Sequence, residues 1–245
     1  MIIDRMLLGA VRRWLLFFNL AVTVYVGLPM AAPALMEAGM TRSANLLYKV
    51  YSPMCHQLAS RSFFLFGEQH AYPRALAGTS LRPIEEYMPG IPEFARSSPD
   101  PAVWGDFLLA ARAFRGNLQM GYKIALCQRD LGIYLSLLAG GLIYGVLRRF
   151  RKIRPMPFWL FVILGLGPVA VDGFSQLLSQ LFVGLGIESM MRLFPLREST
   201  PFLRMLTGAI MGLSIAWLIL PRLNEQFAAS ADDIERRIRT QSGAN

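Results

Sequence analysis

Two short motifs hold the side chains best suited to binding a metal ion. The first is Cys55-His56-Gln57, and the second is Cys127-Gln128-Arg129-Asp130. Zinc in proteins usually takes four ligands in a tetrahedron, and thiolate, imidazole and carboxylate groups are its common ligands. The sequence therefore predicts a candidate zinc site with four ligands: Cys55, His56, Cys127 and Asp130.

The two cysteines also allow two other interpretations. Outside the cytoplasm thiols can be oxidised, and Cys55 and Cys127 would then form a disulfide. Alternatively, both thiols are free and merely packed. With only two cysteines and two histidines, a multi-disulfide scaffold and several metal sites are excluded, but all three interpretations remain open.

A carboxylate within an apolar run is a second candidate functional group. Asp172 lies inside the apolar stretch 158–182, and Ser175, Gln176 and Ser179 follow at the spacing that places them on the same helical face. A charge within a membrane is costly unless it is paired, hydrated or protonated, so such residues are candidate functional groups. The alternative for Asp172 is a structural hydrogen bond between helices.

Charged residues also gather between the last two apolar stretches: Arg192, Arg197, Glu198, Ser199 and Arg204. These arginines can pair with Asp172, with Glu198 or with lipid phosphate. Ordinary arginines that reach toward the membrane surface are the alternative.

Four apolar stretches are the elements that must position these groups. They cover 14–36, 131–147, 158–182 and 203–220, each near the length that spans a bilayer, so we predict an all-α bundle of four membrane helices. A cleaved signal peptide is the alternative for the first stretch. Pro168 predicts a kink one turn before Asp172. The pairs Gly141–Gly145 and Gly208–Gly212 predict close helix packing, with homo-oligomerisation as a further option.

The basic residues predict the orientation of the chain. They cluster before the first span (Arg5, Arg12, Arg13), between the second and third (Arg148, Arg149, Arg151, Lys152, Arg154) and after the fourth (Arg222, Arg236, Arg237, Arg239). With four spans all three clusters lie on one side, which the positive-inside rule makes cytoplasmic. We therefore expect a multi-pass protein of a bacterial cytoplasmic (inner) membrane, with both termini in the cytoplasm.

Composition agrees with a membrane location. Hydrophobic residues make up 54% of the 245 residues and charged residues 17%, with a mean hydropathy of +0.39. The net charge of +9 does not indicate nucleic-acid binding, because the basic residues flank apolar runs and no binding motif accompanies them.

These spans divide the chain into four parts. Residues 1–36 form a tail and the first span, 37–130 a long extracytoplasmic segment, 131–220 a three-helix bundle, and 221–245 a charged tail that is helical at the surface. Prolines throughout the middle of 37–130 predict loops and short helices that cap the bundle. The polar groups of all segments then meet at the outer membrane boundary, as a binding site there requires.

The chain resembles a family of bacterial membrane proteins catalogued as domain of unknown function twenty eighty-five. The resemblance rests on Cys55-His56-Gln57, Arg61-Ser62-Phe63-Phe64, Cys127-Gln128-Arg129-Asp130 with Gly132-Ile133-Tyr134, Asp172-Gly173 with Gln176, and Arg197, Ser199, Arg204, Thr207-Gly208 and Gly212. It extends over about 50–220, with 71–118 as an insertion. The family pattern has a second cysteine where this chain has Asp130. The resemblance implies a multi-span helical protein and no established activity.

Three functions compete on these grounds. We favour a binding or accessory protein with a metal or disulfide-ordered site at the outer interface, in which Gln57, Arg61, Arg129, Gln176, Arg197, Ser199 and Arg204 are further polar candidates. The alternatives are an enzyme acting on a lipid-linked or redox substrate, with Asp172 or His56 as the acid–base group, and a small transporter that uses Asp172. Expected partners are the lipid bilayer and a second copy or another membrane protein.

Overall fold

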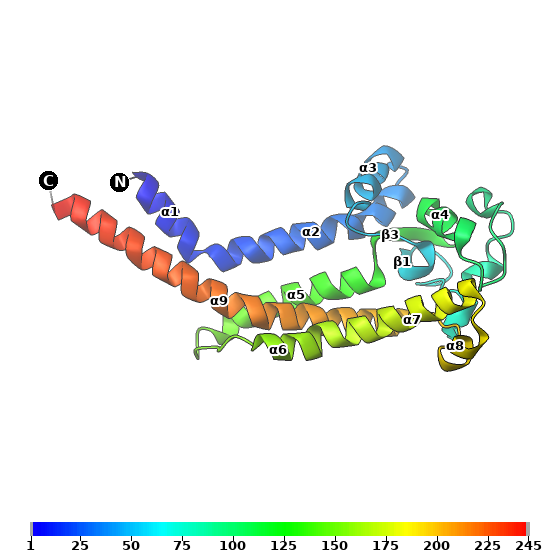
Figure 1. Ribbon diagram of the computed structural model, residues 1–245. Helices are drawn as coiled ribbons and strands as arrows, with labels where there is room; N and C mark the ends of the chain where they lie inside the picture. The colour runs from blue at the N-terminus through cyan, green and yellow to red at the C-terminus, as the bar shows by residue number, and fades with distance from the viewer. Residues whose placement is uncertain (1, 244–245) are drawn as a thin grey trace.

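The computed structural model describes residues 2–243, and most of them are helical. Within this range four helical segments are long and apolar enough to cross a membrane: Trp14–Glu37, Gln128–Leu147, Phe158–Leu185 and Pro201–Gln241. They lie side by side along one axis (Figure 1). The predicted bundle of four membrane helices is therefore confirmed, and the protein is a multi-span membrane protein.

The first span is α2 (Trp14–Glu37), preceded by the short helix α1 (Ile2–Arg12). The second is α5 (Gln128–Leu147), and the fourth is part of α9 (Pro201–Gly243). α2 continues through Pro29 and Pro33, and α9 continues through Pro221. The charged tail is thus helical as predicted, and it extends the fourth span without a break.

The third span changes its helical geometry where the sequence predicts a kink. It consists of α6 (Phe158–Phe161), one π-helical turn (η5, Val162–Leu166) and α7 (Gly167–Leu185), so that Pro168 lies in the first turn of α7. Proline lacks an amide hydrogen and clashes with the preceding turn, and the wider π turn accommodates both effects. A short helix, α8 (Glu188–Leu193), follows this span.

Residues 38–127, which we name the cap, cover one end of the bundle. The cap contains α3 (Thr41–Tyr51), α4 (Gly105–Ala113) and four 3-10 turns, η1 (Ala59–Arg61), η2 (Ala75–Ala77), η3 (Ile84–Glu86) and η4 (Pro92–Phe94). Its own hydrophobic core includes Phe64, Tyr72, Ile84, Phe107 and Met120. The predicted loops and short helices are therefore present, and they enclose a core of their own.

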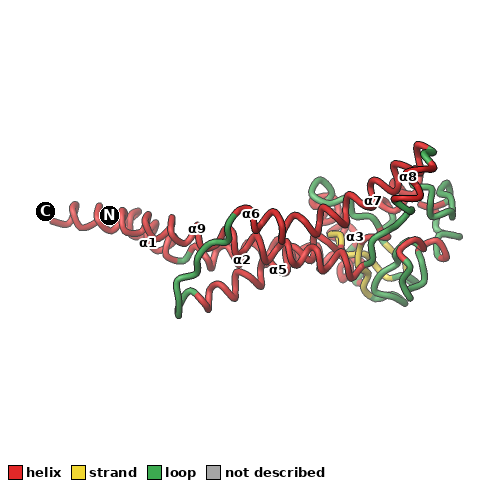
Figure 2. The backbone as a smooth tube through the Cα atoms, turned by 60° about the horizontal axis from the view of Figure 1, so that its bottom comes forward, coloured by secondary structure: helices red, strands yellow, loops and turns green. Residues whose placement is uncertain are grey.

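The cap also contains a small sheet, which the sequence analysis did not predict. Strands β1 (Ser62–Leu65), β2 (Gly116–Asn117) and β3 (Gly121–Cys127) pair antiparallel in the order β1-β3-β2 (Figure 2). Because β3 leads directly into α5 at Cys127, the sheet fixes the start of the second span.

Small residues allow the second and fourth spans to approach closely, as predicted. A Cβ atom on Gly208 would lie 2.3 Å from the carbonyl oxygen of Arg129, and one on Gly212 would lie 2.1 Å from that of Ile133. Gly141 instead allows α2 to approach α5, because a Cβ there would lie 2.1 Å from Oδ1 of Asn19. These glycines thus pack helices within one chain.

The end of the bundle opposite the cap, which we name the basic end, carries all three arginine-rich segments. There α1 lies beside the C-terminal part of α9 (Figure 1). Trp14 stacks on Phe227 with ring centroids 5.2 Å apart, and Arg12 pairs with Glu235. α1 and the C-terminal part of α9 therefore lie at the same end of the bundle, as an even number of spans requires.

Candidate functional site

The cysteine motifs meet where β3 passes into α5. Cys127 caps the helix, because its sulfur accepts a hydrogen bond from the amide of Asp130 at 3.5 Å. The amide of Cys127 in turn donates to the sulfur of Cys55 at 3.1 Å. Ligand atoms of Cys55, Cys127 and Asp130 all lie within 4.8 Å of one another. Three of the four predicted metal ligands are therefore brought together, and both cysteines are free thiols.

His56 is the predicted ligand that this cluster does not include. Its side chain is exposed, while Cys55 and Gln57 on either side are buried. Gln57 has a left-handed backbone with φ of 52°, a conformation that costs a residue other than glycine about 1–3 kcal/mol. This turn directs the Cys55 thiol inward and leaves the imidazole outside.

Buried hydrogen bonds hold that turn in place. The Gln57 side chain donates from Nε2 to the carbonyl of Tyr48 at 3.0 Å, and the Gln57 carbonyl accepts from Lys123 Nζ at 2.6 Å. Lys123 Nζ also donates to the carbonyls of Ala111 at 3.1 Å and Arg112 at 2.9 Å. Burial nevertheless lowers the pKa of Lys123 to about 7. This role of Lys123 was not predicted, since nothing in a lone lysine indicates that it will be buried.

The two thiols differ in acidity because the Cys55 thiol donates a hydrogen bond to the Cys127 sulfur. This bond lowers the pKa of Cys127, and the same bond, followed by burial, raises the pKa of Cys55. Cys127 is therefore the sulfur that more readily carries negative charge, as a metal ligand or nucleophile must.

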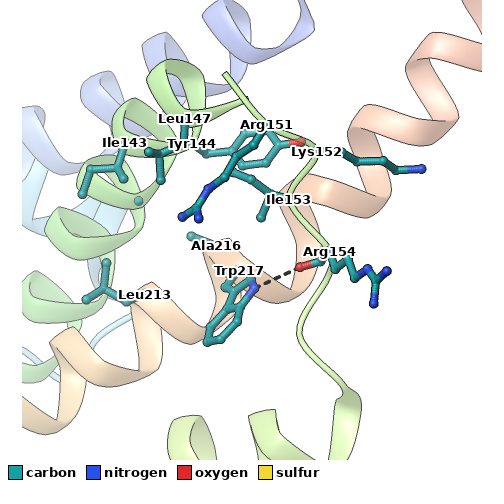
Figure 3. A pocket seen from close by; sticks show the side chains of 11 residues that line it. Ile143, Tyr144, Leu147, Arg151, Lys152, Ile153, Arg154, Leu213, Ala216 and Trp217 are labelled. Atoms are coloured by element: carbon teal, nitrogen blue, oxygen red, sulfur yellow. Dashed lines mark hydrogen bonds between the residues drawn. The ribbon is translucent and has the colours of Figure 1, made fainter. Parts of the chain in front are cut away.

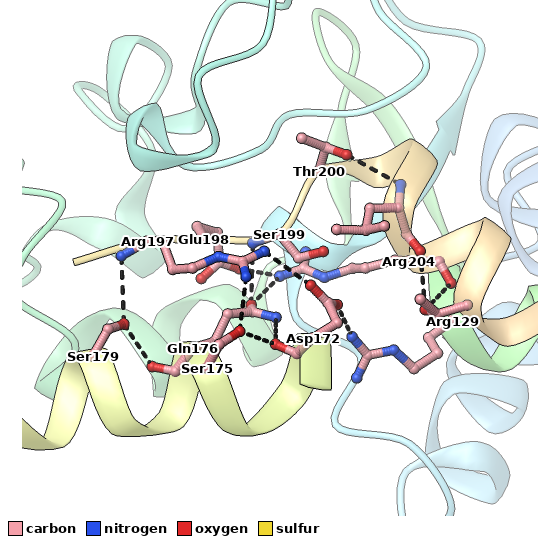
Figure 4. A network of polar contacts seen from close by, with 12 residues as sticks. Arg129, Asp172, Ser175, Gln176, Ser179, Arg197, Glu198, Ser199, Thr200 and Arg204 are labelled. Atoms are coloured by element: carbon pink, nitrogen blue, oxygen red, sulfur yellow. Dashed lines mark hydrogen bonds and ion pairs between the residues drawn. The ribbon is translucent and has the colours of Figure 1, made fainter. Parts of the chain in front are cut away.

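Beside the thiols lies a polar network in which two carboxylates are each shared by two arginines. Figure 4 shows the part of it around Asp172, Gln176 and Arg204. Asp172 on α7 pairs with Arg129 and, at 3.0 Å, with Arg197. Glu198 pairs with Arg204 and, at 3.0 Å, with Arg61. Both carboxylates are almost entirely buried.

Gln176 connects the two halves of this network. Its Oε1 accepts from Arg204 Nη2 at 3.0 Å and from the amide of Ser199 at 3.2 Å, and its Nε2 donates to the carbonyl of Asp172 at 2.8 Å. Arg197 also donates to Ser175 Oγ at 2.7 Å. The predicted helical face of α7 is thus the face that receives the segment 197–204.

The arrangement answers several predictions about individual residues. Asp172 pairs with arginines, one of the options for its charge, and both of its oxygens are occupied. Arg192, by contrast, is exposed on α8 and lies outside the network. The pairing of Arg129 with Asp172 was not predicted, because the partners lie on different spans and no sequence spacing relates them.

A cavity of about 480 Å³, which we name the cap cavity, joins the thiols to this network. Its lining comprises Met54, Cys55, His56, Gln57, Leu58, Arg61, Trp104, Leu108, Cys127, Arg129, Asp130, Gly173, Gln176, Leu177, Gln180 and Arg204. Six members of the predicted polar cluster therefore line one cavity, namely Cys55, His56, Cys127, Asp130, Gln176 and Arg204, whereas Asp172 does not line it. Gln180 was missed, although it follows Gln176 by four residues on the same helical face.

A second cavity of about 480 Å³ lies at the basic end. Figure 3 shows Trp217 in its wall, donating from Nε1 to the carbonyl of Arg154 at 3.0 Å. Its lining is apolar apart from Arg151, Lys152 and Arg154 and includes no cysteine, histidine or carboxylate. Of these two cavities, only the cap cavity is lined by cysteine, histidine and carboxylate side chains, the common ligands of zinc.

Comparisons with known proteins agree with the resemblance noted in the sequence. Residues 111–218 match the model of a family described as predicted membrane protein (DUF2085). The match includes Cys127, Asp172 and Arg204, whereas Cys55 and Arg61 lie before it.

An uncharacterized protein of Methanocaldococcus jannaschii is 27% identical over 175 residues, which cover 71% of this chain and 67% of that protein. No solved structure matches the chain. These findings identify a predicted membrane protein and assign no activity to it.

Proposed function

We propose that this protein is a membrane-bound binding or accessory protein that holds a zinc ion at the outer membrane boundary. The observation that carries the proposal is the meeting of the Cys55, Cys127 and Asp130 ligand atoms within 4.8 Å. Ligand atoms of one tetrahedral zinc lie roughly 3.5–3.8 Å apart, given bonds of about 2.0–2.3 Å. Small side-chain adjustments would bring the three atoms to these separations.

The fourth ligand position of such a site faces the cap cavity. Three protein ligands with one open position are the arrangement found in catalytic zinc sites, where water or substrate occupies the fourth. His56 also lines the cavity and would reach the metal only if its side chain turned inward.

Metal analysis of the full-length protein, purified without chelators, tests this proposal. We expect about one equivalent of zinc, and we expect Cys55→Ser and Asp130→Asn to lose it. Asp106→Asn is a matched control, because Asp106 is an exposed carboxylate of the cap outside the cluster. His56→Ala, with exposed His70→Ala as its control, determines whether the fourth ligand is the imidazole. A wild-type protein without bound metal would refute the proposal.

A disulfide is a second candidate for the same residues, favoured by the contact between the thiols. The hydrogen bond from the Cys127 amide to the Cys55 sulfur spans only 3.1 Å, so the two residues are close enough to be cross-linked after small movements. Thiol titration of the denatured protein distinguishes the two candidates. Two reactive thiols in the absence of reductant would exclude the disulfide. No reactive thiols before reduction and two after it would exclude the metal.

We also propose that the cap faces away from the cytoplasm and that both termini lie in the cytoplasm. The three arginine-rich segments at the basic end support this orientation through the positive-inside rule. A periplasmic reporter fused near exposed Pro89 in the cap should be active, and the same reporter fused after residue 243 should not be.

A further inference from the structure

Several buried donors without a partner belong to side chains that line the cap cavity. Nε of Arg129, Nη1 of Arg204 and Nε2 of Gln180 each have no acceptor within the described residues, and all three residues line this cavity. Arg204 is only 3% exposed. A buried donor without an acceptor, above all one on a charged group, is strongly unfavourable, so this cluster indicates that a ligand supplies the missing acceptors.

The net charge of the polar network indicates the sign of the charge on that ligand. Four guanidinium groups, those of Arg61, Arg129, Arg197 and Arg204, share only two carboxylates, Asp172 and Glu198. These six groups therefore carry a net charge of two positive units, and three of the arginines line the cavity. Of the other lining groups, Asp130 offsets one of these charges.

The arrangement of the unpaired N–H donors favours one kind of anion. Two guanidinium groups and one amide present unused N–H groups from three helices, α5, α9 and α7. Arginine forks match the oxygen atoms of phosphate groups, which offer acceptors in several directions at once. Leu177 of α7, 58% exposed on a membrane span, also lines the cavity, so the cavity is accessible from the lipid as well as from water.

We propose that the cap cavity binds a phosphoryl group through Arg129, Arg204 and Gln180. This inference does not depend on the zinc proposal, because its donors are separate from the metal ligands. A phospholipid headgroup and free phosphate share the required chemistry, and the experiment below distinguishes between them.

The test uses the full chain, delipidated in neutral detergent and treated with EDTA. Inorganic phosphate is titrated by calorimetry, and phosphatidic acid is compared with phosphatidylcholine in nanodiscs by native mass spectrometry. Saturable binding of phosphate or a preference for phosphatidic acid supports the proposal and identifies the source. Absence of both overturns it.

Variants assign the binding to these residues. Gln180→Leu should weaken binding at least about tenfold, as loss of one hydrogen bond to a charged ligand does. It should leave folding intact, because this donor has no partner within residues 2–243. Arg129→Lys keeps the charge beside Asp172 and removes the unused Nε, and it should weaken binding similarly. Arg192→Gln, which removes an exposed arginine outside the cavity, should bind as the wild type does.

Cys55→Ser separates this proposal from the zinc site. Phosphoryl binding that persists in Cys55→Ser supports the arginine site even if no zinc is ever found. Binding that appears only after zinc is added back, is lost in Cys55→Ser and is unchanged in Gln180→Leu and Arg129→Lys would place the anion on a metal ion, and it would overturn the proposal.

Discussion

The two ends of the bundle use the same ion-pair chemistry in opposite surroundings. At the cap end, Glu198 and Arg204 are paired with side-chain exposures of 0% and 3%. At the basic end, Lys152 pairs with Glu225 at exposures of 80% and 53%. Buried pairs are costly to break because a lone charge cannot be solvated, whereas exposed pairs contribute little. Loss of one charge should therefore destabilise the cap end more than the basic end.

The strongest challenge to this comparison is Asp172→Asn. The substitution leaves Arg129 and Arg197 without their shared counter-charge, and we expect a loss of about 3–5 kcal/mol in the free energy of unfolding. Thermal unfolding followed by tryptophan fluorescence in detergent would measure it. Asp233→Asn, which removes a half-exposed carboxylate at the basic end, is the matched control and should have almost no effect. Equal effects would contradict the proposed difference.

Lys123→Met tests whether burial of charge extends into the cap. Three carbonyl groups would lose their donor, and we expect a loss of about 2–3 kcal/mol at neutral pH. Lys49→Met, on exposed α3 surface, is the control.

The same lysine predicts a pH dependence. Its pKa of about 7 in the folded protein lies below the value of about 10.4 in an unfolded chain. Between these values the unfolded state binds the extra proton, so stability should rise as pH increases from about 7 to 10. Melting temperatures measured across this range should show the rise in the wild type but not in Lys123→Met. If the melting temperatures of the wild type and of Lys123→Met changed with pH in the same way, the three carbonyl groups would be keeping Lys123 protonated.

Gly212→Ala tests the close packing of α5 against α9. These two helices run between the cap end and the basic end of the bundle (Figure 1). A Cβ on Gly212 would lie 2.1 Å from the Ile133 carbonyl oxygen, and forcing the backbones apart should cost about 1–3 kcal/mol. A Cβ on Gly184 would have no neighbouring atom within 4 Å, so Gly184→Ala should be neutral or slightly stabilising. Comparable melting temperatures for the two variants would contradict the close packing.

Arg12→Ala should give the smallest effect. Its pair with Glu235 is 60% and 27% exposed, so we expect less than about 1 kcal/mol, and less still at high salt. Thermal unfolding at low and high salt would check this. A larger loss would show that the contact between α1 and α9 contributes more than its exposure indicates.

The sequence predicted the spans well because apolar length and arginine clusters are local signals. It also predicted that Asp172 and Gln176 share one face with Arg197 and Arg204 nearby, since helical spacing and a short connection place them together. It could not predict that Arg129 pairs with Asp172, because that pairing depends on how α5 packs against α7. The strands of the cap were missed because Ser62–Leu65 and Gly121–Cys127 are short and separated by proline-rich loops. The exposure of His56 follows from the left-handed turn at Gln57, which no sequence pattern reveals.

The length of α9 has a consequence for how the two ends of the bundle are connected. This helix has 43 residues and no break, so it spans about 65 Å at 1.5 Å per residue. Arg204 near its start forms part of the cap cavity, while Glu235 near its end contacts α1. One continuous helix therefore connects the lining of the cap cavity to the contact between α1 and α9 at the basic end.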